Sequence, residues 1–326
     1  MVVPASLSTS GAIVTAIQRH ERLVHELQTA LDVQVKLLDQ LTRQLPTTGD
    51  SSASLPRQRS PQHTATTEHT ATAQLVARLL GSFEIQLGGG SVDTWRSQKA
   101  ASLLKYLLLQ EAHSARRDVL MDVFWPRSSP KSARNNLNVT VYQLRSTLRG
   151  YDPSRTHVVY RVGSYRLDHQ LTLWTDVDEY TQAVHLGHQC SERGDTVAAL
   201  TAYRHAHALY RGELLEDDTS GEWFFDMQRR LRLDHFTLLE RLGVLLLEHG
   251  DLNQSAVMGE DLVAADPCRE TGYQLLMRTY AALGQPQLVV NQYRRCVDVL
   301  RRELAVGPDQ STTSLFASLV PAAVWP

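Results

Sequence analysis

The sequence lacks the features that mark secreted and membrane proteins. Its 326 residues include only three cysteines, Cys190, Cys268 and Cys296, which lie far apart and are odd in number. This usage argues against a disulfide framework and favours a reducing compartment. The apolar runs are too short to span a bilayer, and no charged segment precedes an apolar one at the N-terminus. We therefore expect a cytoplasmic protein with no membrane partner.

Motifs of nucleotide-binding and metal-dependent enzymes are also missing. No Lys-Ser/Thr pair follows the glycine run Gly88–Gly90, so this run predicts a turn and not a phosphate loop. No cysteine has metal-ligand spacing with another cysteine or a histidine, and the 13 histidines are scattered. The carboxylates Glu213, Glu216, Asp217 and Asp218 could do acid–base work, but no nucleophile or cofactor motif accompanies them. A solvated loop or a protein contact is favoured there, and we expect no enzyme activity, no cofactor and no metal.

Charge is uneven along the chain, although the net charge is only −2. Residues 1–74 hold 6 Lys and Arg and 6 Asp and Glu. Residues 75–168 hold 14 and 7, a net charge of +7, whereas residues 169–326 hold 13 and 22, a net charge of −9. A basic block beside an acidic one suggests a polyanion partner for the basic block only. The opposite charges also predict that the two blocks pack against each other.

The N-terminal 74 residues predict a helix followed by a linker. Apolar residues recur every seven positions over 11–45, at Ile17, Val24, Leu31, Leu38 and Leu45. This period indicates a coiled coil through which the chain would form a homodimer; a long helix packed on its own protein is the alternative. Residues 46–74 carry almost no large apolar side chain, so they cannot bury enough surface to offset their ordering entropy and predict a disordered linker.

Residues 75–168 predict a small mixed domain. Strands over 75–87, broken at Gly81, precede a helix over 97–109 and a second helix from about Ser114 to Pro126. A third helix covers 131–148, and the β-rich runs on either side of Gly163 and Ser164 predict a hairpin over 157–168. Helix, turn, helix and then hairpin is the order of a winged helix-turn-helix domain.

The third helix has an unusual polar face, without any acidic residue. The 4-4-3-4 spacing of its apolar residues predicts one buried stripe. That stripe comprises Ala133, Leu137, Val141, Leu144 and Leu148. The opposite face offers Arg134, Asn135, Asn138, Val139, Tyr142 and Arg145. Arginine and asparagine suit the base edges of the major groove, and Lys131 stands at the helix start, where phosphates are favoured. A solvated face without a partner is the alternative, and the surrounding +7 block argues against it.

From residue 175 the pattern is helical and contains a repeat. Residues 239–246 and 273–280 share their apolar spacing, and the turn glycines Gly250 and Gly284 stand 34 residues apart. This period is typical of tetratricopeptide units, although Gly259 stands where an aromatic residue is usual. An earlier unit surrounds Gly194, and an insertion over 210–223 separates it from the next. The fold class expected is mainly α with a small β component: a winged helix over 75–168 and a tetratricopeptide-like domain over 169–326, preceded by the coiled-coil helix.

These motifs resemble a known family of regulators. The stretches LLGSFEIQLGG, SQKAASLLKYLLL, RRDVLMDVFWP, SPKSARNNLNVTVYQLRSTLR and VGSYRLD follow one another as in the OmpR-type winged helix of the antibiotic-regulatory (SARP-like) activators. The stretches WTDVDEY, YRGELL and EWFFDMQRRLRLDHFTLLERLG resemble the bacterial transcriptional activation domain that follows it. The likeness covers about residues 75–320. The N-terminal helix and linker lie outside the usual short activator, and the ATPase module of larger relatives is absent.

The resemblance implies an activator that binds direct repeats in double-stranded DNA as a dimer and contacts RNA polymerase. It places the DNA contacts on Arg134, Asn135, Asn138, Tyr142 and Arg145 of the third helix and on Arg161, Ser164 and Tyr165 of the hairpin. The alternative from the residues alone is a protein-interaction scaffold of tetratricopeptide type with only non-specific DNA affinity. Loss of binding in salt without any sequence preference would favour the scaffold.

Overall fold

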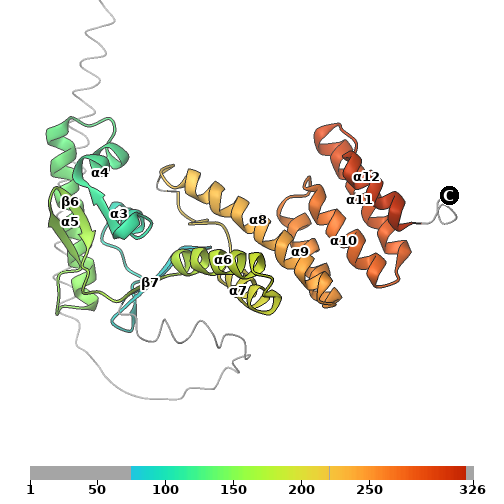
Figure 1. Cartoon of the computed structure of the whole chain (residues 1–326). Helices are drawn as coiled ribbons and strands as arrows, with labels where there is room; N and C mark the ends of the chain where they lie inside the picture. The colour runs from blue at the N-terminus through green and yellow to red at the C-terminus, as the bar shows by residue number, and fades with distance from the viewer. Residues whose placement is uncertain (1–74, 220, 321–326) are drawn as a thin grey trace, which may run out of the picture. The chain divides into compact units, whose positions relative to one another are not determined.

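The structure, a computed structural model, describes residues 75–219 and 221–320 (Figure 1). The predicted coiled coil over 11–45 and the linker over 46–74 lie outside these residues. Within them the chain is mainly helical with two small sheets, in agreement with the expected fold class. No helix in this part of the chain combines the length and apolar composition of a membrane-spanning segment.

The first sheet joins the start of the described chain to a later segment. Its strands are β1 (Leu75–Arg78), β2 (Glu84–Leu87), β3 (Gly90–Ser91) and β7 (Leu173–Thr175), in the order β3-β2-β1-β7. Strand β1 runs antiparallel to β2 and parallel to β7. The predicted break at Gly81 is confirmed, since this glycine has a φ of 93°. There the chain bridges to Leu214, which lies far along the sequence.

The second sheet and three helices form the winged helix. In chain order the elements are α3 (Gln98–Leu108), the short 3-10 turn Glu111–His113, β4 (Ser114–Arg116), α4 (Arg117–Phe124), α5 (Pro130–Tyr151), β5 (Val158–Arg161) and β6 (Ser164–Leu167). Helix α5 begins where the Ser129 side chain accepts a hydrogen bond from the backbone N–H of Ser132, with Pro130 in its first turn. The predicted third helix and hairpin are therefore both present.

One expected boundary is wrong. The second helix does not begin near Ser114, because residues 114–116 form strand β4, and α4 begins only at Arg117. Strand β4 pairs antiparallel with β6, so the sheet order is β4-β6-β5 and the wing has three strands. This pairing provides hydrogen bonds to backbone N–H and C=O groups of residues 114–116, which in a helix would bond to nearby residues.

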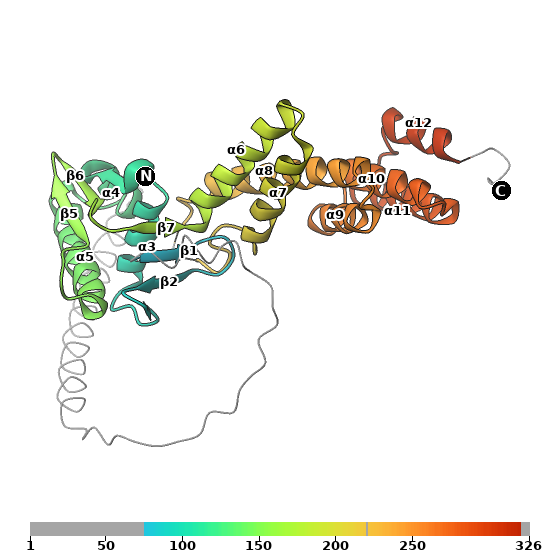
Figure 2. The same ribbon diagram turned by 60° about the horizontal axis from the view of Figure 1, so that its bottom comes forward.

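Beyond β7 the described chain is helical. The helices are α6 (Asp176–Glu192), α7 (Thr196–Leu209), α8 (Phe225–Glu248), α9 (Leu252–Ala265), α10 (Glu270–Ala282), α11 (Pro286–Leu304) and α12 (Gln310–Leu319). Successive helices contact each other as the pairs α6 and α7, α8 and α9, and α10 and α11 (Figure 2). The glycines Gly194, Gly250 and Gly284, predicted as turns, have positive φ and separate the two helices of each pair. The missing aromatic at Gly259 also has a reason: a Cβ there would lie 2.7 Å from Cγ of Leu276, so the crossing of α9 and α10 admits only glycine.

The loop over 210–223 docks on the winged helix. Leu214 and Leu215 are fully buried, and Trp223 packs against Tyr106 of α3 with ring centroids 5.2 Å apart. Ion pairs cross the same junction: Lys105 Nζ lies 2.7 Å from an Asp218 carboxylate oxygen, with both side chains buried, and Arg211 lies 3.6 Å from Glu84 of β2. The acidic and basic blocks therefore do meet, but mostly through apolar side chains of one continuous core.

A stack of aromatic rings lies buried between α7 and α8. The rings of Tyr210 and His235 are nearly parallel, with centroids 3.7 Å apart, and the His207 ring is nearly parallel to that of His235 at 5.6 Å. Burial and, to a smaller extent, the neighbouring His207 together lower the pKa of His235 to about 3. Burial also lowers the pKa of His157, His188 and His207. The folded protein therefore holds His235 neutral at pH values where the unfolded chain binds a proton.

We expect acid to destabilise the protein through His235. Because its pKa is about 3 when folded and 6.5 when unfolded, its contribution to stability is complete above pH 6.5 and is lost as the pH falls towards 3. The slope is about 1.4 kcal/mol per pH unit for one proton. In His235→Phe, which keeps an aromatic ring, the free energy of unfolding measured in urea between pH 6 and 4 should lose that one-proton slope. His249→Phe, at an exposed position, should keep it; parallel pH profiles for His235→Phe and the parent would contradict the expectation.

Candidate nucleic-acid interface

Helix α5 buries the stripe that its sequence predicts. Ala133, Leu137, Val141, Leu144 and Leu148 are at most 3% exposed. The opposite face is open to solvent at Arg134, Asn135, Asn138, Val139 and Tyr142, and Tyr142 is 72% exposed. No acidic residue occurs anywhere in α5. The helix therefore presents hydrogen-bond donors and amide groups on a surface that carries no negative charge of its own.

Arg145 and the wing hold each other in place. The Arg145 side chain is half-buried, and its Nε donates a hydrogen bond of 2.8 Å to the backbone carbonyl of Val158 in β5. This bond joins the C-terminal half of α5 to strand β5 of the wing, which lies beside the helix (Figure 2). A DNA contact by Arg145 would have to come from its terminal guanidinium nitrogens.

Tyr165 lies inside the wing and not on its surface. It is only 7% exposed, and its ring packs at a tilt of 48° against that of Tyr160, with centroids 4.7 Å apart. Burial raises the pKa of Tyr165, so its hydroxyl stays protonated, and it donates to Oδ1 of Asn138 across 3.4 Å. That Tyr165 touches DNA stays a prediction, and in the structure its hydroxyl lies against the Asn138 amide.

The remaining predicted residues lie at the edges of this surface. Lys131 is exposed in the first turn of α5, at the end of the helix where the helix dipole favours an anion. Arg161 is exposed at the end of β5, and Ser164 is half-buried opposite it in the hairpin. Lys131, Arg134, Asn135, Asn138, Tyr142 and Arg161 are therefore all accessible on α5 and the hairpin.

Val162 is not among the residues predicted from the sequence, and the structure places it at the tip of the wing. This side chain is 98% exposed and stands between Arg161 and Gly163. The sequence does contain a sign that this residue is unusual, because a two-residue hairpin turn ordinarily carries asparagine or glycine at the position of this valine.

Two family models match this chain. Residues 93–167 match the model described as "Transcriptional regulatory protein, C terminal", and residues 175–320 match the "Bacterial transcriptional activator domain". The first match contains α3 to β6, and the second contains α6 to α12. Their order along the chain is the order that the sequence motifs predict.

Curated proteins of related sequence are transcriptional regulators. The chain is 27% identical to the transcriptional regulatory protein MoaR1 of Mycobacterium tuberculosis over 264 residues, which cover 80% of this chain and 84% of the relative. It is 26% identical to the regulatory protein AfsR of Streptomyces griseus over 254 residues, which cover 78% of this chain but only 25% of that much longer protein.

A solved structure shares the fold. The match is to "Mycobacterium tuberculosis EmbR in complex with low affinity phosphopeptide", with a TM-score of 0.65 and 21% identity over 76% of this chain and 65% of that one. The winged helix, the helical domain after it and the sequence relatives all indicate a transcriptional regulator. The chain is therefore a DNA-binding transcriptional regulator, and its two domains and their order are similar to those of the SARP-like regulators.

Proposed function

We propose that the chain is a sequence-specific activator that reads direct repeats in double-stranded DNA with α5 and its wing. The observation that carries this proposal is the exposed, acid-free face of α5, on which Arg134, Asn135 and Asn138 stand together. Asparagine pairs with adenine through two hydrogen bonds, and arginine does so with guanine. The hydrogen bond from Tyr165 to Asn138 supports this role, since a fixed amide discriminates between bases better than a rotating one.

The other polar residues would bind the DNA backbone. Lys131, Tyr142 and the terminal nitrogens of Arg145 would contact phosphates along α5, and Arg161 and Ser164 would do so from the wing. Such contacts supply affinity without sequence information. We assign the winged helix to residues 75–168 and the activation domain to 169–326.

Activation would follow from the helical domain. Helices α6 to α12 belong to the part of the chain with a net charge of −9 over residues 169–326, which is unsuited to DNA and available for a protein partner. We assign RNA polymerase as that partner. Two copies of the chain would occupy neighbouring half-sites in the cytoplasm, and residues 11–45 would raise their effective concentration as a coiled coil. No catalytic role is assigned.

The experiment that tests this function is selection of bound fragments from sheared genomic DNA by the purified full chain, followed by sequencing. The selection is run at about 50 and about 200 mM salt, because phosphate contacts weaken steeply over that range. A motif of spaced direct repeats that survives the higher salt is the expected result. Recovery of random fragments only, all lost at the higher salt, would replace the activator with the protein-interaction scaffold.

A further inference from the structure

A cavity lies where the first sheet, α3 and the loop over 210–223 meet. Its volume is about 380 Å³, within the range of about 300–1,000 Å³ that is usual for small-molecule sites. Its lining residues come from segment 82–95, from α3 and from the loop, whereas α5 and the hairpin build the proposed DNA interface. The cavity is therefore separate from that interface, and DNA does not explain it.

Part of the cavity lining is aromatic, and it already binds a cation. Phe83 and Trp95 both line the cavity, are half-buried, and have ring centroids 6.3 Å apart. The Lys105 ammonium lies 4.5 Å from the centre of the Phe83 ring, where the negative face of the ring attracts it. Trp95, for which the described part of the chain supplies no cation, offers a second ring of the same kind. The lining therefore suits a positively charged ligand that also has an apolar part.

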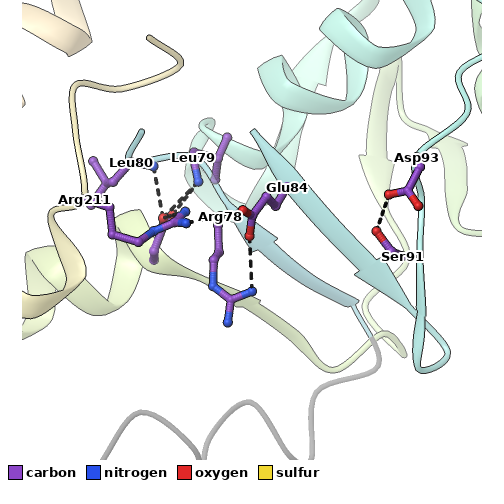
Figure 3. A network of polar contacts seen from close by, with 8 residues as sticks. Arg78, Leu79, Leu80, Glu84, Ser91, Asp93 and Arg211 are labelled. Atoms are coloured by element: carbon purple, nitrogen blue, oxygen red, sulfur yellow. Dashed lines mark hydrogen bonds and ion pairs between the residues drawn. The ribbon is translucent and has the colours of Figure 1, made fainter. Parts of the chain in front are cut away.

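Four carboxylates line the cavity, and two of them have cationic partners. Asp218 pairs with Lys105 at 2.7 Å. Glu84 lies 3.6 Å from Arg78 and 3.6 Å from Arg211 (Figure 3). The protein therefore neutralises these two carboxylates with its own side chains.

The other two carboxylates, Asp93 and Asp217, have no ion-pair partner among residues 75–219 and 221–320. Each accepts a hydrogen bond from a serine hydroxyl instead. Ser82 donates to Asp217, and Ser91 donates to Asp93, as Figure 3 shows for the second pair. A hydroxyl orients a carboxylate but leaves its charge in place. The cavity therefore keeps two negative charges that the described chain does not neutralise.

We propose that this cavity binds a small aliphatic amine that carries two ammonium groups. One ammonium group pairs with Asp93 and the other with Asp217, and the methylene chain between them packs on Trp95. A metal ion fits less well, because no three acidic, histidine or cysteine side chains of the described chain are placed to hold one. The bound amine touches α3 and the 210–223 loop at once, so it also stabilises the junction between the winged helix and the helical domain.

The test is isothermal titration calorimetry of the full chain with diaminopropane, putrescine and cadaverine, which differ only in the length of the methylene chain. DNA is left out, because its phosphates bind the same amines. We expect a single site, an affinity that depends on the length of the amine, and a melting temperature that rises with ligand concentration. Butylamine, which is putrescine without one ammonium group, should bind roughly tenfold more weakly or worse.

Variants of the lining locate the amine. Asp93→Asn and Asp217→Asn each remove one charge and keep an oxygen that accepts from the neighbouring serine. Each should weaken binding of the best diamine roughly 10- to 100-fold. Asp226→Asn is the matched control, at a fully exposed carboxylate of α8, and should leave the affinity unchanged.

A second pair of variants tests the aromatic contact. Trp95→Phe keeps a ring in the lining, so it should retain most of the affinity. Trp95→Leu keeps only an apolar side chain and should weaken binding roughly 2- to 30-fold. Equal affinities for the two variants would remove the ring from the site.

Three results would overturn the proposal. The first is neither heat of binding nor a rise in melting temperature with any of the three diamines. The second is full affinity in Asp93→Asn or Asp217→Asn, because both carboxylates are required. The third is an equal loss of affinity in Asp226→Asn, which would mean that the amine binds the negative surface at large. Because no DNA is present, none of these results bears on the proposed activator function.

Discussion

Arg134→Ala combined with Asn138→Ala is expected to remove sequence preference and leave non-specific DNA binding largely in place. Each base contact contributes about 1–3 kcal/mol of discrimination, so the loss of two should lower affinity for the selected motif by roughly 30-fold to 20,000-fold. Both side chains are exposed, and the one described hydrogen bond that is lost within the protein is the long one from Tyr165 to Asn138. The fold should therefore survive. Fluorescence anisotropy with the motif and a scrambled duplex, at one salt concentration, measures the ratio of the two affinities.

Two controls distinguish base-specific recognition by α5 from electrostatic binding to the DNA backbone. Lys131→Ala should weaken binding to both duplexes equally and reduce the slope of log affinity against log salt by about one, as a phosphate contact requires. Arg229→Ala, at an arginine that is 71% exposed on α8, should leave both affinities unchanged. An unaltered ratio of motif to scrambled binding in the double variant would mean that α5 is not the reading helix.

Local periodicity was sufficient to predict α5, and the reason is geometric. A helix of 22 residues repeats its buried positions every three or four residues, so the stripe from Ala133 to Leu148 is visible in the sequence alone. Strand β4 has no such signal. Its three residues are defined by pairing with β6, about 50 residues further on, and a short run beside a helix looks like part of that helix.

The burial of single side chains was harder to predict than the elements themselves. Tyr165 alternates with half-buried neighbours on β6, and only the packing of the wing against α5 shows that its ring points inward. Asp218 belongs to a stretch that appears solvated in the sequence, yet Lys105 of α3 binds it inside the junction. Both contacts join segments far apart in the chain, and periodicity carries no information about such partners.

Asp176 is the most consequential case of this kind. In the sequence it is an ordinary acidic residue in the first turn of a helix, where a carboxylate favours the helix dipole. In the structure its side chain is 2% exposed, and its polar partners are Leu79, Leu80 and Arg211, which lie close together (Figure 3). The backbone N–H of Leu79 donates to both carboxylate oxygens, at 2.8 and 3.0 Å, and that of Leu80 donates to one at 3.0 Å.

The charge of Asp176 is balanced between opposing effects. Burial raises the pKa of this carboxyl above its ordinary value of 3.8, while the two backbone N–H groups and Arg211, 3.7 Å away, act to lower it. Because the folded pKa is the higher one, protonation favours the folded state below pH 3.8, and that contribution is lost as the pH rises through the folded pKa. The hydrogen bonds and Arg211 therefore offset only part of the desolvation cost of the charged carboxylate.

Asp176→Ala is accordingly expected to destabilise the protein by about 2–5 kcal/mol at pH 7, because it leaves the backbone N–H groups of Leu79 and Leu80 buried without acceptors. Asp176→Asn should cost less, since it keeps one acceptor oxygen but turns an amide donor towards those N–H groups. Urea unfolding gives both values.

Asp226→Ala is the matched control. Asp226 is also an acidic residue in the first turn of a long helix, but its side chain is fully exposed. The unfolding midpoint of this variant should stay near that of the parent. Equal midpoints for Asp176→Ala and Asp226→Ala would show that the carboxylate does not hold α6 to the first sheet.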